Sequence, residues 1–195
     1  MVPTQAERTE ATRGRLIATA RRLFGEKGFA ATSTEEILSE AEVSRGALYH
    51  HFSSKTDLFR ATFEAVEEEL TAKLLETATA GGETDPIKIL ELGFNTFLDQ
   101  CLNPEVQRIV MLDAPTVLGW DTWHELDERY AFGTIKAVLA VAADSGRIEA
   151  EAVDSLTHLL VGAVMQAGMV VARADDPAAA KQLLGESFAL LVSTL

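Results

Sequence analysis

The sequence is poor in the residues that mark several classes of protein. Its one cysteine, Cys101, excludes an internal disulfide and a multi-thiolate metal site, and such low cysteine usage is typical of a reducing cytoplasm. The longest apolar run, residues 159–172, is interrupted by Gln166 and is shorter than the ~18 residues of a membrane span. The first residues run into alternating charges without an apolar stretch, so we expect no secretory signal. These absences predict a cytoplasmic protein with no membrane partner.

Basic residues are also scarce, but they are unevenly distributed. The chain has 17 Lys and Arg against 30 Asp and Glu, a net charge of −13 that taken whole disfavours binding to nucleic acid. Residues 1–60, however, carry nine basic and eight acidic residues, a net charge of +1, whereas residues 61–195 carry eight and twenty-two, a net charge of −14. The acidity therefore belongs to the second part of the chain, which indicates two parts with different roles.

No stretch alternates apolar and polar residues as a half-buried strand does, and Ala and Leu supply 53 of the 195 residues. The sequence therefore predicts an all-α fold. A break at residues 81–86 (GGETDP) separates a domain at residues 10–70 from one at 81–195. We expect helices ending at Gly28, over 34–41, 44–51, from 54 to beyond 70, and over 86–103, 104–114, 122–143, 151–174 and 177–195, with an irregular link at 115–121.

Two helices of fewer than ten residues, joined by a tight turn at residues 41–43, predict a helix-turn-helix over about residues 33–52. Ser33 and Ser44 are placed to cap its two helices, and Ser53 or Ser54 to cap the helix that follows. We expect a small shared core made of Leu16, Leu23, Phe24, Ile37, Leu38, Val43, Leu48 and Phe52.

The second helix of such a pair lies in a DNA major groove and leads with its N-terminal residues, here Ser44, Arg45, Gly46 and Ala47. Arg45 has the reach to bridge guanine O6 and N7, Gly46 permits close approach of the backbone, and Ala47 suits a thymine methyl. The candidates for phosphate contacts on the flanks are Thr32, Ser33, Thr34, Tyr49, His50 and Lys55. Each of these alone is equally explained as a helix cap or a half-buried side chain, and only their combination favours DNA binding.

The stretch from about Glu10 to Leu70 resembles the DNA-binding domain of the TetR (tetracycline-repressor) family of bacterial transcriptional regulators. The resemblance is carried, in order, by ARRLF (20–24), KGF (27–29), TST (32–34), VSRGALYHHF (43–52) and SKTDLF (54–59). One departure is Glu42, where the family often has glycine in the turn. A non-glycine residue there costs about 1 kcal/mol if its backbone is left-handed.

The resemblance implies a homodimer that binds a palindromic operator and usually represses transcription. It also implies that a small-molecule effector binds the C-terminal helical domain, shifts the fourth helix and changes the separation of the two DNA-reading helices. It implies neither enzymatic activity nor a cofactor.

The last two expected helices suggest a dimer interface. Small and apolar residues recur on one face of the first, namely Leu159, Gly162, Ala163, Gln166, Ala167, Val170 and Ala174. A complementary stripe on the second comprises Leu183, Leu184, Ser187, Leu191 and Leu195. The alternative is the core of a monomer, although two such helices would then leave a large apolar surface exposed. The resemblance favours a four-helix bundle with two helices from each subunit.

A ligand site in the second domain is harder to place from sequence. Its large or adaptable side chains are Phe94, Phe97, Cys101, Met111, Trp120, Trp123, Tyr130, Phe132, Met165 and Met169. A pocket also needs a few polar groups, and five residues are candidates for them: Arg108, Asp113, His124, His158 and Gln166. Most of these residues belong to an ordinary core on the simplest interpretation, and we expect a medium-sized, largely apolar ligand with one or two polar groups.

Two other functions remain open at this point. One is a helical enzyme with its site on the carboxylates and histidine of Asp121–Glu128 together with His158, although this segment lacks the second histidine of the zinc signature His-Glu-x-x-His and we expect no metal. The other is a DNA-binding regulator that responds to a protein partner instead of a small molecule.

Overall fold

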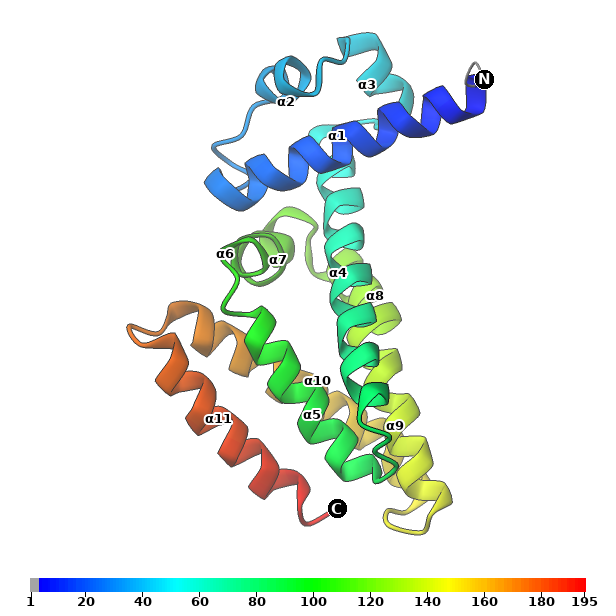
Figure 1. The fold of residues 1–195 in the computed structure, drawn as a ribbon, viewed down its shortest axis with the longest axis vertical. Coiled ribbons are helices and arrows are strands. Elements are labelled where there is room, and N and C mark those ends of the chain that lie inside the picture. Colours follow the sequence, from blue (N-terminus) through cyan, green and yellow to red (C-terminus); the bar gives the residue numbers. More distant parts are fainter. Residues whose placement is uncertain (1–3) are drawn as a thin grey trace.

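The computed structural model describes residues 4–195, and for Thr79, His124, Asp127 and Glu128 it describes the backbone alone. The chain is 82% helical and its described residues contain no strand, which confirms the all-α fold. Figure 1 shows the first three helices at one end of an elongated molecule and α4 running from them along its length. The helices of this N-terminal part are α1 (Gln5–Lys27), α2 (Thr34–Ala41), α3 (Arg45–His51) and α4 (Lys55–Ala80).

The short helices of the N-terminal part start where serine side chains cap them. Ser33 accepts a hydrogen bond from the Glu36 N–H at the start of α2, and Ser44 does the same for Ala47 at the start of α3. Before α4, Ser54 accepts from the Asp57 N–H. These caps satisfy backbone donors that an isolated helix end leaves without partners, so the predicted helix starts are confirmed.

A shared apolar core holds these helices together. Leu16 and Phe24 of α1, Ile37 of α2 and Leu48 of α3 are all buried, as the sequence predicts. The first turns of α4 join them through Phe59, whose ring lies edge-on to that of Phe24 with 5.2 Å between centroids. The start of α4 is therefore part of the same core as α1, α2 and α3.

The remaining helices form the C-terminal part. They are α5 (Pro86–Gln100), α6 (Pro104–Val106), η1 (Gln107–Asp113), α7 (Ala114–Val117), α8 (Trp120–Asp127), η2 (Glu128–Phe132), α9 (Gly133–Asp144), η3 (Ala150–Ala152), α10 (Val153–Arg173) and α11 (Pro177–Val192). The segments η1 and η2 are π-helical, and η3 is a 3₁₀ turn.

The predicted irregular link at 115–121 is wrong except at Leu118 and Gly119. The chain stays helical from Pro104 to Val117, and Pro115 lies in the first turn of α7, where a proline is tolerated because helix geometry leaves those N–H groups unpaired. Only Leu118 and Gly119 separate α7 from α8, and Gly119 has a φ of 77°.

Within the C-terminal part, α5 packs against α4, α9 and α11, and α10 packs against α9, α11 and η1. The rings of Phe94 in α5 and Phe188 in α11 are stacked, 3.9 Å apart between centroids. These two helices approach closely because Gly185 has no side chain, and a Cβ there would collide with Asn95. By length and composition, Ala150–Arg173 is the one described helix apolar enough to cross a membrane, and 33% of its apolar window is buried.

Candidate functional sites

The N-terminus of α3 presents a small exposed surface. Leu48 points into the core, while Ala47 is half-buried. Five residues that the sequence singled out are exposed on this helix and its cap: Ser44, Arg45, Gly46, Tyr49 and His50. A Cβ at Gly46 would meet no heavy atom within 4 Å, so the backbone there is open to a close approach from outside.

Arg45 does not lie free on this surface. Its guanidinium forms an ion pair with the Glu35 carboxylate of α2, and both side chains are mostly exposed. The pair joins the two helices of the helix-turn-helix at their outer face. If Arg45 binds the edge of a base, that base must either displace Glu35 from the guanidinium or bind the N–H groups that Glu35 leaves free.

Thr32 is placed differently from the prediction. Its side chain is 1% exposed, and its hydroxyl donates to the backbone carbonyls of Gly28 and Leu23, at 2.9 and 3.2 Å. The hydroxyl thus braces the loop between α1 and α2, and a phosphate contact through this side chain is a wrong prediction. Ser33 is exposed and Thr34 partly exposed, so both remain candidates.

Lys55 is also engaged inside the protein. Its ammonium donates to the carbonyls of Phe29 and Thr32, at 2.9 and 2.8 Å, and lies 4.0 Å from the centre of the Phe29 ring. Burial lowers the pKa of this amine. Lys55 therefore ties the start of α4 to the loop before α2, and a phosphate contact rests on its third N–H alone.

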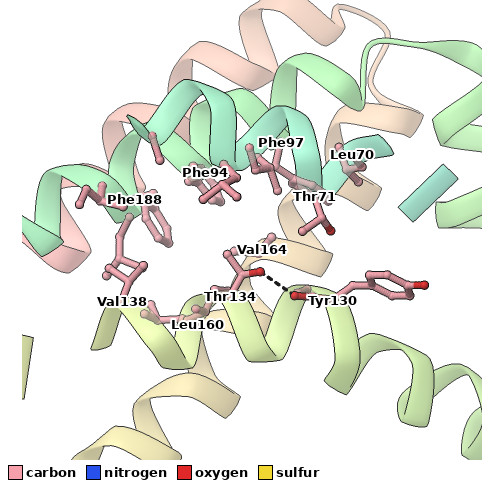
Figure 2. A pocket seen from close by; sticks show the side chains of 18 of the residues that line it. Leu70, Thr71, Phe94, Phe97, Tyr130, Thr134, Val138, Leu160, Val164 and Phe188 are labelled. Atoms are coloured by element: carbon pink, nitrogen blue, oxygen red, sulfur yellow. Dashed lines mark hydrogen bonds between the residues drawn. The ribbon is translucent and has the colours of Figure 1, made fainter. Parts of the chain in front are cut away.

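A largely apolar cavity of about 470 Å³ lies in the C-terminal part between α4, α5, η2, α9, α10 and α11. Figure 2 shows Thr71 reaching into it from α4, with Val164 and Thr134 on the opposite side. The lining comprises Glu67, Leu70, Thr71, Leu74, Leu75, Ala78, Gly82, Glu83, Thr84, Ile89, Leu90, Gly93, Phe94, Phe97, Tyr130, Ala131, Thr134, Ile135, Val138, Leu160, Val164, Met165 and Phe188. Its volume suits a small organic molecule.

The outer faces of α10 and α11 carry exposed apolar side chains. On α10, Leu159 is 70% exposed and Val170 and Gly162 share its face. On α11, the exposed leucines are Leu183, Leu190 and Leu191. Here we call this surface the α10–α11 face. Such a patch of large apolar groups on two adjacent helices is the usual mark of a protein interface.

Comparison with known families identifies the kind of protein that carries these surfaces. A sequence model described as "Bacterial regulatory proteins, tetR family" matches residues 16–62. A second, described as "Tetracyclin repressor-like, C-terminal domain", matches residues 87–195, more than half of the chain. The chain belongs to the TetR family. It is accordingly a helix-turn-helix transcriptional regulator, as the resemblance in its first third predicts.

Relatives of the TetR family resemble the chain over most of its length. A crystal structure of a TetR-family regulator from Pectobacterium atrosepticum is 30% identical, with a TM-score of 0.78 over 97% of this chain and 95% of that one. The Transposon Tn10 TetC protein of Escherichia coli is 29% identical over 158 residues, covering 81% of this chain and 79% of that protein. The structure of RolR with resorcinol shares the fold, with 22% identity, a TM-score of 0.74, and coverage of 96% of this chain and 90% of that one.

Within this TetR-family fold, four of the residues that the sequence singled out for the ligand site line the cavity, namely Phe94, Phe97, Tyr130 and Met165. The other described candidates lie elsewhere. Cys101 and Met111 pack beside Gly168, and Arg108 lies against Gly28. Trp123 is buried beside Trp120, which is 68% exposed, and His158 lies against the Phe132 ring, while Met169 and Gln166 lie outside the lining. The side chain of His124 lies outside the described part of the structure.

The cavity wall that the sequence missed is the second half of α4. Leu70, Leu74 and Ala78 recur at the spacing of one helical face, together with Thr71 and Leu75. That spacing was visible in the sequence, but it looks the same for a plain core helix. Tyr130 was among the noted aromatics, and only the packing of η2 against α4 shows that it belongs to the lining.

The predicted dimer residues differ in their exposure in the structure. Leu159, Gly162, Val170 and Leu191 are exposed on the α10–α11 face, and Ala163 and Leu184 are half-buried. Ala167 is 4% exposed because it points into the subunit's own core, so its place in an interface is a wrong prediction.

The structure describes only part of the site on which the enzyme alternative depends. Among the residues that the structure describes, no three His, Cys, Asp or Glu side chains gather as they would around a metal ion. The side chains of His124 and Glu128, on which that alternative depends, lie outside this description.

Proposed function

We propose that this TetR-family protein is a ligand-responsive repressor, a cytoplasmic homodimer that binds a palindromic operator and is released by a small, largely apolar effector. The observation that carries the proposal is the continuity of α4. Its first turns belong to the N-terminal core through Leu58 and Phe59, and its last turns form a wall of the cavity through Leu70 and Leu74. Figure 1 shows this one helix spanning both parts.

A second copy of the chain is the occupant that suits the α10–α11 face. Two subunits that pack these helices together form a four-helix bundle and cover Leu159, Leu183 and Leu190 in one step. A two-fold dimer places its two α3 helices on half-sites about 34–36 Å apart, which makes the operator palindromic. The domain limits that we propose remain 10–70 and 81–195, with α4 continuing from the first toward the second.

The cavity also indicates the character of the effector. Of the described residues that line it, two carry carboxylates, Glu67 and Glu83, and none is Lys or Arg. Backbone N–H groups of Asp85 and Thr84 hold the pKa of Glu83 below its usual range, so this carboxylate stays ionised. A neutral or cationic apolar molecule therefore suits the cavity better than an organic acid does. RolR, a protein of the same fold, has been crystallised with resorcinol, a neutral ligand.

Release follows from the geometry of α4. A molecule that fills the space beside Leu70, Thr71 and Leu74 presses on the second half of α4, and the first half carries the helix-turn-helix with it. A shift of a few ångströms in one subunit spoils the simultaneous fit of two half-sites. A coupling of about 1–3 kcal/mol between the two sites is typical of such regulators.

The test uses Gly93, which lines the cavity and whose added Cβ would meet no heavy atom within 4 Å. After operator selection from a random DNA pool and a metabolite screen for release, Gly93→Leu is expected to bind the operator like the wild type but to resist release. Gly93→Ala is the matched control, because one methyl leaves most of the volume. Release of the Gly93→Leu variant at the wild-type effector concentration would contradict the cavity as effector site and favour a protein partner.

A further inference from the structure

The basic residues of the N-terminal part are unequally engaged. Of the nine Lys and Arg in residues 1–60, six interact with a carboxylate or a backbone carbonyl: Arg21, Arg22, Lys27, Arg45, Lys55 and Arg60. Among the described residues, no carboxylate pairs with Arg8, Arg13 or Arg15. All three lie in the first half of α1, so the unpaired positive charge of this near-neutral domain is concentrated in one segment.

The direction in which these arginines point follows from helical spacing. Residues seven apart on an α-helix share a face, so Arg8 and Arg15 lie on the same face as Arg22. Arg22 pairs with Glu40 of α2, which shows that this face of α1 is turned toward the helix-turn-helix. Arg21, about 100° around α1 from Arg22, pairs with Glu105 and Glu69 of the acidic body. The face with Arg8 and Arg15 is therefore turned away from that body.

The segment that carries them is an ordered helix close to α3. Thr4 and Glu7 form a capping box at its start, in which the Thr4 N–H donates to the Glu7 carboxylate at 2.6 Å. Arg13 lies with its guanidinium 5.5 Å from the ring centre of Phe52, the residue that ends α3. Figure 1 shows the first turns of α1 level with α3 and projecting past it, at the end of the molecule opposite the C-terminal helices.

We propose that Arg8 and Arg15 bind phosphates of the DNA backbone beside the half-site that α3 reads. Both side chains are exposed, have no carboxylate partner among the described residues and are carried on a preformed helix, so binding costs neither a broken ion pair within that part nor the folding of a tail. The other basic groups that face the DNA, Arg45 and Lys55, are already held by Glu35 and by two carbonyls. Arg8 and Arg15 thus supply the sequence-independent attraction that the charge-balanced helix-turn-helix lacks. This inference rests on the proposed DNA-binding function.

The experiment compares Arg8→Ala/Arg15→Ala with the wild type on two duplexes of equal length, the selected operator and a random sequence, over a salt series. Each lost phosphate contact reduces the steepness of log affinity against log salt by about 0.9, and a homodimer of the double variant loses four such contacts. The affinity lost between 50 and 200 mM salt should therefore be about 150-fold smaller for the double variant. The decrease should be the same on both duplexes, because phosphates carry no sequence information.

Two control variants make the test specific. Arg147→Ala/Arg173→Ala removes the same charge from the body and should keep the wild-type slope, while Arg8→Lys/Arg15→Lys should largely retain it. The melting temperature of Arg8→Ala/Arg15→Ala should match the wild type, since neither side chain pairs with a carboxylate in the part of the chain that the structure describes.

The outcomes separate this inference from the proposed function. A wild type that binds the operator together with a double variant of unchanged salt slope overturns the phosphate contacts alone. A slope that falls on the operator but not on the random duplex also overturns them, in favour of base contacts. A wild type that selects no operator and shows no salt-dependent binding overturns the proposed function, and this inference with it.

Discussion

The carboxylate of Asp113 accepts a hydrogen bond from the backbone N–H of Phe29, with 2.7 Å between Oδ2 and the nitrogen. Asp113 ends η1 in the C-terminal part, and Phe29 follows α1 in the N-terminal part. By its sequence Asp113 is a candidate polar group of the ligand pocket, whereas in the structure it lies at the junction of the two parts. Nearby, Glu105 of α6 pairs with Arg21 of α1. The junction is thus a polar clamp between η1, α6 and α1.

This clamp is connected to the cavity by packing. A Cβ placed on Gly168 would lie 2.9 Å from the sulfur of Met111 and 3.0 Å from the ring of Phe97, so both side chains close over the same glycine. Phe97 lines the cavity, and Met111 precedes Asp113 by two residues on the π-helical η1. An effector that displaced Phe97 would therefore also displace Met111 and η1.

We expect Asp113→Ala to weaken the response to effector. A hydrogen bond to a charged group contributes about 1.5–3 kcal/mol, which is comparable with the whole coupling of such a regulator. The measurement is the ratio of operator dissociation constants with and without effector, which should approach one. Asp113→Asn retains an acceptor and should keep most of the ratio. A wild-type ratio in the alanine variant would show that the junction does not carry the coupling.

Glu42 is strained in the turn of the helix-turn-helix. Its φ of 54° and ψ of 43° place it in the left-handed region, and it is the one non-glycine residue with positive φ among the described residues. We expect Glu42→Gly to raise the free energy of unfolding by up to about 1 kcal/mol, measured by urea denaturation. Glu42→Ala keeps a Cβ and should show little of this gain. Equal stabilisation by both variants would assign the effect to the lost charge instead.

Substitutions at Arg45 and Glu35 should have opposite effects on DNA binding. Arg45→Ala should weaken operator binding by about 1–3 kcal/mol and relax specificity at one base pair. Glu35→Gln removes the carboxylate that competes for the guanidinium and should tighten binding. Fluorescence anisotropy on the operator and on duplexes substituted at single positions measures both effects. An equal loss on all sequences for Arg45→Ala would show that Arg45 contacts phosphate only.

Cys101 should make stability depend on pH in the alkaline range. Burial, and then the negative charge of Glu67, raise the pKa of this thiol from its ordinary value of 9.0 to about 12. Because the folded pKa is the higher one, the stabilisation is complete below pH 9 and is lost as the pH rises toward 12. The loss amounts to about 1.4 kcal/mol per pH unit at most. In urea denaturation from pH 8 to 10.5, the stability of the wild type should fall with pH more steeply than that of Cys101→Ala, by up to this slope, whereas parallel curves would contradict the shift.

Much of the N-terminal part was predictable because its structure is local. Ser33, Ser44 and Ser54 cap helices through bonds to residues three positions on, and such short-range patterns are visible in the sequence itself. The inward roles of Thr32 and Lys55 were not predictable. Their partners include carbonyls nine and twenty-six residues away, and whether a polar side chain turns inward depends on how distant segments pack.

The lining of the cavity was still less predictable from the sequence. Phe94, Phe97 and Met165 were identified by their size and their position in the second part of the chain, but the lining is contributed by six helical segments. Met111 and Cys101 have the same chemical character and lie elsewhere, because the close approach of Gly168 brings them against Phe97 on another side. Residue type distinguishes apolar from polar surroundings, and only packing distinguishes a filled core from an empty space within it.

The sequence by itself determined the helical class, the helix-turn-helix, the contrast between a near-neutral first part and an acidic body, and through its motifs the family. These properties follow from composition and from short-range spacing, which are complete in the amino-acid order. The tertiary structure decided which arginines remain unpaired, which residues enclose the cavity, and that Asp113 joins the two parts. Each of these depends on contacts between segments far apart in the chain, and their geometry exists only once the helices are packed.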